Sequence, residues 1–326
     1  MKIITSPSYF PPFNIASEEY LIKEFSEDIF LLYINEPTII IGINQNTLAE
    51  INVDYIKANN INVVRRLSGG GAVFHDQGNL NFSFITNISG NKKIDFRRYT
   101  QPIINALQNI GIDAKFEGRN DLTIDGRKFS GNASHIYKNR ICHHGTLLFD
   151  TDLTQLSKSI QPKEDKFQGK AVKSVRSRVT NIKEYLKEEY TIEEFRSYII
   201  NQVIKDINDA VAYNYSEEDI KNINKLVDNK FNTWEWNYGA SPKYNFCKSI
   251  RKPAGIIELY IYVEKGLIKE INIYGDFFGI KPVKELINLF ISKEHNEECI
   301  ASILDSVDIN DYLSGFEKED ILGLFF

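Results

Sequence analysis

The amino-acid sequence predicts an α+β protein built from a large and a small domain. Short apolar runs typical of strands are interrupted by helical patterns through most of the chain. The pattern changes after residues 234–239, where Pro242 and Pro253 flank a polar stretch that precedes a hairpin pattern and short helices. We therefore expect a main α+β domain over residues 1–246, a linker over 247–252 and a small α+β domain over 253–326.

Strands are predicted where apolar runs are short and bounded by turn residues. In residues 79–84 polar and apolar side chains alternate, which is the pattern of a strand with one buried face. Residues 264–266 end on a glycine and indicate the turn of the hairpin in the small domain. The expected strands cover residues 29–34, 38–43, 61–64, 80–86, 111–116, 121–124, 145–150, 256–263 and 267–274.

Helices are predicted where apolar residues recur with helical spacing. Thr191 lies three residues before Glu194 and forms the pattern of a capping box, and Ser216 is a candidate cap for the helix after it. The expected helices cover residues 15–25, 53–59, 96–110, 192–211 and 217–227.

Composition excludes several classes of protein. The 326 residues carry 39 Lys and Arg against 44 Asp and Glu, and this net charge of −5 argues against a protein that coats nucleic acid. The first residues lack the apolar core of a signal peptide, and no apolar run is long enough for a membrane span. The three cysteines show no metal-ligand spacing and fit a reducing compartment, so we expect a cytoplasmic protein.

The strongest local feature is the segment of residues 65–75, RRLSGGGAVFH. Three consecutive glycines let a ligand approach the backbone amides, and two preceding arginines supply charge suited to a carboxylate or a phosphate. This pattern favours an anion site, although a glycine-rich turn beside two solvated arginines has the same composition. The segment is neither a Walker loop nor a dinucleotide fingerprint.

A second cluster spans residues 118–122 and 126–133, GRNDL and GRKFSGNA. Lys128 stands among small residues, so it can approach a phosphate as a point charge, but an exposed hairpin lysine is the commoner outcome. Asn120 and Asp121 could hold a hydrated magnesium ion or a ribose, or they could cap a turn.

Two further segments carry charge or histidine. His143 and His144 are adjacent on an expected strand and point to opposite faces, which favours structural hydrogen bonds over a shared metal. Residues 163–181 are the most basic stretch of the chain. A solvated loop is the default interpretation, and a loop that closes over a bound phosphate is the more specific hypothesis.

Taken together, these segments resemble the lipoate–protein ligase family, and the resemblance spans almost the whole chain. RRLSGGGAVFHD followed by GN resembles the lipoate-binding loop of the family, and GRNDL with DGRKFSGNA resembles its adenylate site. The resemblance extends to HHGTLLFDTDL, to SVRSRVTN at residues 174–181, and to TWEWNYG at residues 233–239 before a small hairpin-bearing domain. The combination is far more specific than any single motif.

The resemblance implies a core shared with biotin ligases, a mixed sheet with flanking helices related to class II aminoacyl-tRNA synthetases. It implies a two-step reaction: lipoate attacks the α-phosphate of Mg·ATP to give lipoyl-AMP, and a lysine ε-amine then takes the lipoyl group. The implied acceptors are lipoyl-domain proteins, namely 2-oxoacid dehydrogenase E2 subunits or the glycine-cleavage H protein. A cytoplasmic monomer with ATP and Mg²⁺ as cofactors, lipoate as substrate, and no nucleic-acid or membrane partner is expected.

The resemblance also implies roles for individual residues. Lys128 matches the catalytic lysine of the family, and Asp121 is the candidate magnesium ligand. The implied ATP and adenylate contacts are Arg66, Gly71, Ala72, Val73, Phe74, Asn120, Asp121, Lys128, Arg176 and Arg178. The implied lipoate contacts are Arg66, Ser68, Gly69, Gly70, His75, Lys128, Gly131 and Thr146.

Octanoyltransferases and lipoyl amidotransferases resemble the same core but use a catalytic cysteine and no ATP. Where the carrier-dependent transferases have their nucleophile after a proline, this chain has Lys163 after Pro162, and no cysteine precedes the Lys128 strand. Cys142 is the only thiol close in sequence, and a buried structural role is expected for it. A bare binding module for lipoate or nucleotide is disfavoured, because a complete ligase constellation would then have no use.

Overall fold

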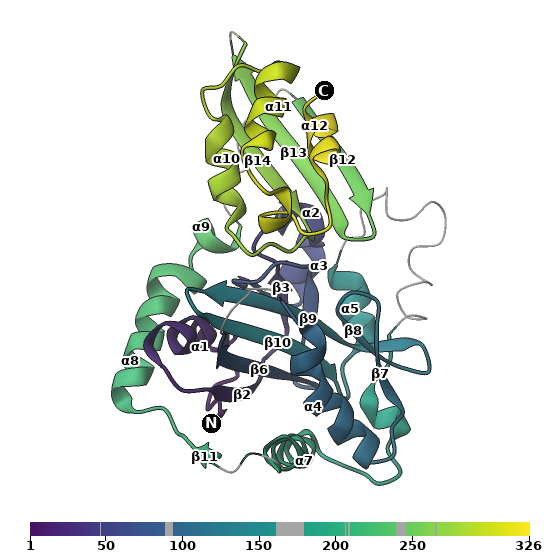
Figure 1. The fold of residues 1–326 in the computed structure, drawn as a ribbon. Helices are drawn as coiled ribbons and strands as arrows, with labels where there is room; N and C mark the ends of the chain where they lie inside the picture. Colours follow the sequence, from purple (N-terminus) through teal and green to yellow (C-terminus); the bar gives the residue numbers. More distant parts are fainter. Residues whose placement is uncertain are drawn as a thin grey trace.

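The computed structural model describes residues 1–326 except 46, 89–93, 161–178, 206, 208, 239–245 and 265. The described chain forms two parts, and each has sheets and hydrophobic cores that it does not share with the other (Figure 1). This arrangement agrees with the expected α+β class and with a small carboxy-terminal domain. No helix in the described part of the chain is both long enough and apolar enough to cross a bilayer.

The main part is organised on a mixed eight-stranded sheet and a smaller three-stranded one. In the large sheet β1 pairs in parallel with β2 and β11, and the remaining pairs are antiparallel. Its order is β11 (Val211–Ala212), β1 (Lys2–Thr5), β2 (Ile29–Ile34), β6 (Asn79–Asn87), β10 (Arg140–Leu148), β9 (Arg127–Tyr137), β8 (Asp121–Ile124) and β7 (Ala114–Glu117). The small sheet has the order β4 (Asn62–Arg65), β3 (Thr38–Ile41) and β5 (Val73–His75).

Helices cover both faces of the large sheet. The longer ones are α1 (Pro11–Glu24) and α8 (Glu217–Leu226) on one face, and α4 (Phe96–Asn109) and α7 (Ile192–Ile204) on the other. Because both faces are covered, all six residues of β2 are buried and they alternate between the two cores. Short helices complete this part: α2 (Thr47–Glu50), α3 (Val53–Ala58), α5 (Leu153–Ser159) and α9 (Trp234–Asn237).

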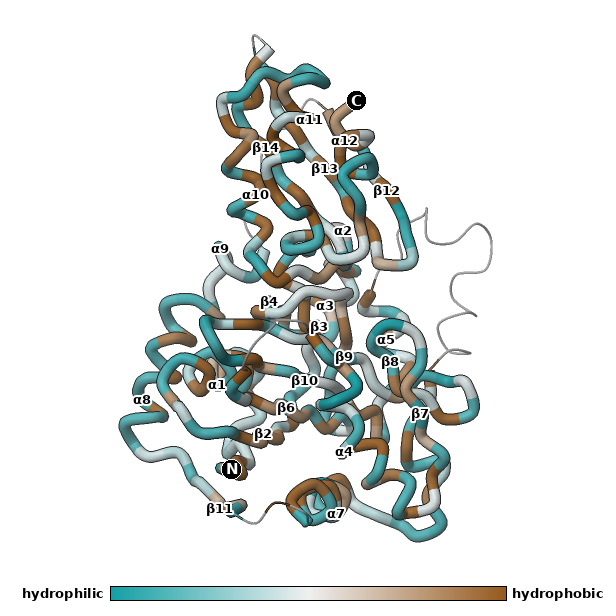
Figure 2. Tube along the Cα trace, in the orientation of Figure 1, coloured by the Kyte–Doolittle hydropathy of each residue, from teal (hydrophilic) through white to brown (hydrophobic). Residues whose placement is uncertain are grey.

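The carboxy-terminal domain is an antiparallel sheet with helices packed on one face. It contains β12 (Phe246–Lys252), β13 (Gly255–Glu264) and β14 (Leu267–Gly275), with α10 (Val283–Phe290), α11 (Glu297–Asp305) and α12 (Lys318–Phe325). Hydrophobic residues, brown in Figure 2, recur along β13 and β14. Ile257, Leu259 and Ile261 alternate with partly exposed residues and enter one core, as expected for a sheet covered on one side.

Residues 247–252, expected as a linker, instead belong to β12 and pair with β13 over its length. The linker prediction was wrong. A polar segment between two domains suggests a linker, but this polar segment forms an exposed edge strand. Cys247, Lys248 and Ser249 are exposed, as residues of an edge strand can be, and only Phe246 and Ile250 contact the core.

Some boundaries also differ from those expected. Helix α1 begins four residues early, because Pro11 and Pro12 occupy first-turn positions that need no amide donor. Helix α7 ends at Ile204 rather than at 211, and residues 211–212 form the edge strand β11. The capping box of Thr191 and Glu194 is present as expected.

Arg65, at the end of β4, is a buried cation that joins three segments of the chain. Its guanidinium donates at 2.6–3.3 Å, and within the described residues its acceptors include no carboxylate. Burial lowers the pKa of Arg65 to about 10, so the side chain stays charged at neutral pH. The acceptors are the Thr47 hydroxyl and the carbonyls of Gly42, Ile43, Gln45, Trp236 and Asn237.

We expect Arg65→Lys to lower the free energy of unfolding by about 3 kcal/mol, because an ammonium cannot reach the acceptors that the planar fork serves. Chemical denaturation measures this change. Arg251→Lys, at an exposed position of β12, is the matched control and should change stability by less than about 0.5 kcal/mol. Equal stability of the two variants would contradict this role for Arg65.

Candidate active site

A cavity of about 110 Å³ lies between the glycine-rich segment and the large sheet. Its wall is formed by α1, by β5 and the segment leading into it, by the strands β2, β3, β6, β9 and β10, and by Asn120 just before β8. The lining residues are Ile15, Tyr33, Ile40, Arg66, Gly70, Gly71, Ala72, Val73, His75, Asn81, Asn120, Lys128, Gly131, Asn132, Ala133, His144, Gly145 and Thr146.

The two motif clusters found in the sequence therefore meet at one cavity. The expected residues that line it are Arg66, Gly70, Gly71, Ala72, Val73, His75, Asn120, Lys128, Gly131 and Thr146. Ser68, Gly69 and Phe74 do not line the cavity, and Asp121 lines a neighbouring hollow. Arg176, Arg178 and the basic stretch of residues 163–178 lie outside the described residues.

Arg66 determines the shape of the glycine-rich loop. One of its terminal nitrogens donates to the carbonyls of Gly69 and Gly71 at 2.7 and 2.9 Å, and Gly70 between them has φ of +93°. The side chain is 5% exposed, and burial lowers the pKa of Arg66 to about 10. Most of its donors are therefore used within its own loop, which the charge pattern in the sequence did not indicate.

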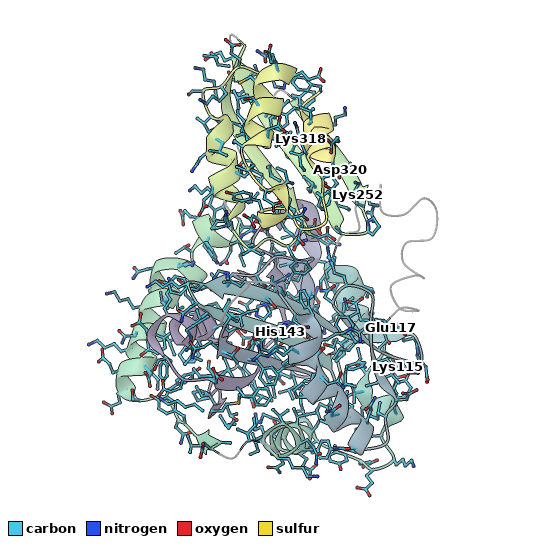
Figure 3. All side chains as sticks on the ribbon, in the orientation of Figure 1. Lys115, Glu117, His143, Lys252, Lys318 and Asp320 are labelled. Atoms are coloured by element: carbon cyan, nitrogen blue, oxygen red, sulfur yellow. The ribbon has the colours of Figure 1, made fainter. Side chains whose placement is uncertain are left out.

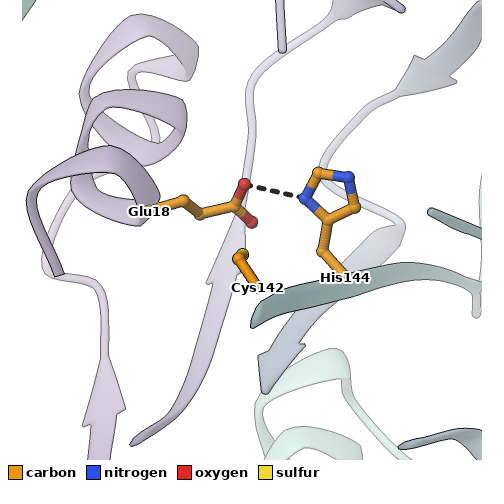
Figure 4. Close-up of side chains that lie close together, drawn as sticks. All are labelled: Glu18, Cys142 and His144. Carbon is orange, nitrogen blue, oxygen red and sulfur yellow. Dashed lines mark hydrogen bonds and ion pairs between the residues drawn. The ribbon is translucent and has the colours of Figure 1, made fainter. Parts of the chain in front are cut away.

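A chain of hydrogen bonds leads from Arg66 to a buried carboxylate on α1. Arg66 Nε donates to Ser68 Oγ at 3.0 Å, and Ser68 Oγ lies 2.6 Å from His144 Nε2. His144 Nδ1 lies 2.7 Å from Glu18 Oε2, and a dashed line in Figure 4 marks this contact. Burial alone would raise the pKa of Glu18, but His144 and the hydroxyls of Ser83 and Tyr33 outweigh it and lower the pKa. Glu18 is thus an ionised, fully partnered carboxylate that no sequence motif marked.

The two adjacent histidines behave as the sequence predicts. His143 lies within the large sheet (Figure 3), where its Nδ1 is 2.9 Å from Ser134 Oγ, whereas His144 faces Glu18 on the other side. Glu18, Cys142 and His144 are close enough together for a metal site, but the carboxylate and imidazole atoms are already hydrogen-bonded. Cys142 is buried, and burial raises the pKa of its thiol, which agrees with the structural role expected for it.

Lys128, on β9, stands where the cavity meets a wider hollow. Its Nζ lies 2.8 Å from Asp121 Oδ1, and a side chain at Gly131 would come within 3.2 Å of the lysine. Both charged groups are between one third and two fifths exposed, at 37% and 38%. The hollow, about 520 Å³, is lined by Glu117, Gly118, Asp121, Thr123, Gly126, Lys128 and Val179.

The carboxy-terminal domain touches this site through residues 276–278. The Gly70 amide donates to the Phe277 carbonyl at 3.3 Å, and Arg119 donates to the Asp276 carbonyl at 3.3 Å. The Arg119 guanidinium also lies over the ring of Phe278, 4.5 Å from its centre. The second domain therefore contacts both Arg119, the cation next to Asn120, and the Gly70 amide of the glycine-rich loop.

Comparison with known proteins decides the family. Residues 11–204 match the lipoyl protein ligase A/B catalytic domain, and residues 241–325 match the bacterial lipoate protein ligase C-terminus. The chain belongs to the lipoate–protein ligase family. The family resemblance, the fold class and the ligase function expected from the sequence are thereby confirmed.

Curated ligases match along nearly their whole length. The chain is 44% identical over 320 residues to the lipoate-protein ligase LplJ of Bacillus subtilis, covering 97% of each. It is 42% identical over 327 residues to lipoate–protein ligase 1 of Staphylococcus aureus, covering 99% of each.

Solved structures of ligases share the fold. LipL1 of P. falciparum in complex with lipoate superposes with a TM-score of 0.79 at 28% identity, covering 94% of this chain and 95% of that one. A bipartite ligase of Thermoplasma acidophilum, described with its E2 lipoyl domain, gives 0.65 at 30% identity over 75% and 98%. A lipoate-protein ligase A bound with ATP gives 0.64 at 28% identity over 73% and 98%.

Two neighbouring glycines of the loop should respond differently to alanine. A Cβ at Gly69 would lie 2.3 Å from the Phe277 carbonyl oxygen, so Gly69→Ala should lower the free energy of unfolding by about 1–3 kcal/mol. At Gly71 the nearest atom is 4.0 Å away, so Gly71→Ala should leave stability unchanged. Chemical denaturation of both variants provides the measurement, and a stability loss at Gly71 matching that at Gly69 would refute the assignment.

Proposed function

We propose that this ligase works in two steps at one site, first activating lipoate with ATP and then acylating a lysine of a lipoyl domain. Relatives described with lipoate, with ATP and with an E2 lipoyl domain support each component. The observation that carries the proposal is the position of Lys128, a cation at the junction of this cavity and a wider hollow. The cavity suits an acyl chain, and the hollow suits a nucleotide.

In the first step a carboxylate attacks a phosphate, so two anions must be brought together. Lys128 would lie between the lipoate carboxylate and the α-phosphate, where a preorganised cation stabilises the charge that develops in the transition state. Asp121 holds the lysine at 2.8 Å until the substrates replace it. The backbone of Gly71, Ala72, Val73 and Phe74 would lie along both the nucleotide and the acyl group, with Gly70 and Arg66 on the lipoate side.

Magnesium is the cofactor that accompanies ATP in this proposal. Because Mg²⁺ is held largely by phosphate and water, it needs only one or two protein carboxylates. Asp121 beside the wider hollow offers one such group, and Asn120 next to it offers an amide oxygen. Bound there, the ion would neutralise phosphate charge. Arg176 and Arg178, outside the described residues, are proposed as further phosphate contacts.

In the second step the ε-amine of an acceptor lysine attacks the lipoyl carbonyl and AMP leaves. The chain need supply no nucleophile, since the amine belongs to the acceptor. The cavity must instead exclude water, because water would hydrolyse the mixed anhydride. In this proposal Gly131 and Thr146 contact the acyl end, and Ser68 acts indirectly by hydrogen-bonding Arg66. We propose E2 subunits of 2-oxoacid dehydrogenases and the glycine-cleavage H protein as acceptors, reached by a cytoplasmic monomer.

Lys128→Ala should abolish the lipoate-dependent exchange of pyrophosphate into ATP by a folded protein. Removing one preorganised charge of this kind commonly costs about 10²–10³ in rate. Lys115→Ala is the matched control, because Lys115 on the edge strand β7 (Figure 3) is an exposed lysine that also pairs with a carboxylate, that of Asp113 at 2.8 Å. Near-normal exchange by Lys128→Ala would contradict the catalytic role of Lys128. Absence of exchange in the unmodified enzyme would favour a transferase or a binding module.

A thiol test separates the ligase from a cysteine-dependent transferase. All three cysteines are unpaired, and only Cys142 is buried. The triple variant Cys142→Ala, Cys247→Ser, Cys299→Ser should keep ATP-dependent lipoylation of a lipoyl domain, because the adenylate is not bound covalently. A covalent mechanism stops without its nucleophile. If activity vanished in the folded variant and returned with Cys142 alone, the amidotransferase alternative would be the better interpretation.

A further inference from the structure

Two carboxylates lie opposite each other at the wall of the wider hollow. Glu117, the last residue of β7 (Figure 3), pairs with Asp121, the first residue of β8, in an antiparallel ladder. Residues paired in this way project from the same face of a sheet, with Cβ atoms about 4.5–5.5 Å apart. Both residues line the hollow. Because like charges directly opposite each other are destabilising, this pair calls for a compensating cation.

The lysines nearby compensate for only part of this charge. Lys128 Nζ contacts Asp121 Oδ1 at 2.8 Å, and Lys115, two residues before Glu117, pairs with Asp113 instead. Within the described residues, neither Asp121 Oδ2 nor the Glu117 carboxylate has a hydrogen bond or an ion pair. Two carboxylates and one ammonium therefore leave negative charge at this wall of the hollow.

A buried hydroxyl beside the two carboxylates also lacks a partner. Thr123 follows Asp121 by two residues on β8, so both side chains are on the same face, and Thr123 pairs with Lys128 of β9. Thr123 is 5% exposed and lines the hollow, yet its Oγ1 has no hydrogen-bond partner among the described residues. Buried polar atoms are normally hydrogen-bonded, so this hydroxyl indicates a water or a ligand in the hollow.

We propose that Glu117 and Asp121 together hold one divalent cation, the Mg²⁺ that accompanies ATP, and that the Thr123 hydroxyl binds a water molecule that the ion retains. This inference rests on the proposed function and assigns its metal a second carboxylate, which no sequence motif marked. Mg²⁺ binds oxygens at about 2.0–2.1 Å and keeps several waters, so two ligands on one ion are roughly 3–4 Å apart. Carboxylates on directly opposed residues can meet this requirement without moving the strands.

The cation also affects Lys128 in this arrangement. A divalent ion at Asp121 competes with the lysine for the same carboxylate and weakens the ion pair that now joins them at 2.8 Å. The Lys128 ammonium is then free to contact the α-phosphate. Metal binding and release of the lysine are thus coupled through one side chain, with Glu117 supplying the charge that makes the metal compete.

Mn²⁺ alone is the first probe, because electron paramagnetic resonance measures the free ion and no nucleotide is needed. The full chain should bind Mn²⁺ at a site from which Mg²⁺ displaces it. Glu117→Gln should weaken this binding about tenfold or more, because the isosteric amide removes one of two ligand charges. Asp113→Asn is the matched control: it removes a carboxylate that precedes the same strand but does not line the hollow, so binding should not change.

Thr123→Val tests the hydroxyl separately. Valine has nearly the same shape, so the variant loses the hydrogen-bonding group alone. We expect the affinity for Mn²⁺ to fall about two- to fivefold with no decrease in the melting temperature. An unchanged affinity would contradict the role of Thr123 in holding the water of the ion.

Titration calorimetry of ATP, with Mg²⁺ and with a chelator, connects the site to the nucleotide. The unmodified chain should bind ATP more tightly with Mg²⁺, and Glu117→Gln should lose most of this gain. The affinity of Glu117→Gln for ATP in the chelator should equal or exceed that of the unmodified chain, because a negative charge beside the phosphates has been removed. A folding defect would instead weaken binding under both conditions.

The outcomes separate the inference from the function beneath it. Unchanged Mn²⁺ binding in Glu117→Gln would overturn the metal site and leave the proposed function standing. Failure of the unmodified chain to bind ATP under either condition would overturn the proposed function, and with it the assignment of the ion to ATP. Loss of Mn²⁺ binding and of the Mg²⁺-dependent gain in Glu117→Gln, with both kept in Asp113→Asn, supports the assignment.

Discussion

The buried carboxylate of Glu18 is the group on which the geometry of the site depends. It is 2% exposed, and its hydrogen bonds with His144, Ser83 and Tyr33 compensate for the loss of water. Through His144 and Ser68 it faces the equally buried guanidinium of Arg66. A buried charge of either sign alone would be costly, so α1, β10 and the glycine-rich loop must assemble together. The shape of an anion-binding loop is in this way determined by an acid on a distant helix.

Much of the fold was readable from the sequence because the hydrophobic pattern determines it. The apolar runs at β2 and β6 and the capping box at Thr191 predicted real elements. Segments whose residues serve a site or an edge were harder, as the polar strand β12 and the three-residue strand β5 illustrate. Their structure depends on pairing with distant strands, which leaves little trace in local composition.

The residues of the candidate site likewise fall into two groups: those that sequence motifs identified and those that only the fold brings to the site. Motifs identified Lys128 and the glycine-rich loop, because a lysine among small residues and three glycines in a row are locally unusual. Glu18, Tyr33 and Asn81 were missed, although the first is hydrogen-bonded to His144 and the other two line the cavity. They come from α1, β2 and β6 and resemble ordinary core positions of an amphipathic pattern. Only the assembled fold brings them together, with Tyr33 donating to Glu18 and with Tyr33 and Asn81 on the cavity wall.

The hydrogen bonds of Arg65 have a consequence for how this region can vary. Five of its six acceptors are main-chain carbonyls, which every amino acid provides. Side chains at Ile43, Gln45 and Trp236 can therefore change without removing an acceptor, whereas the guanidinium has no substitute. An essential contact of this kind leaves no correlated pair of positions in an alignment. Methods that infer proximity from paired substitutions would overlook the junction that connects β4 to α9.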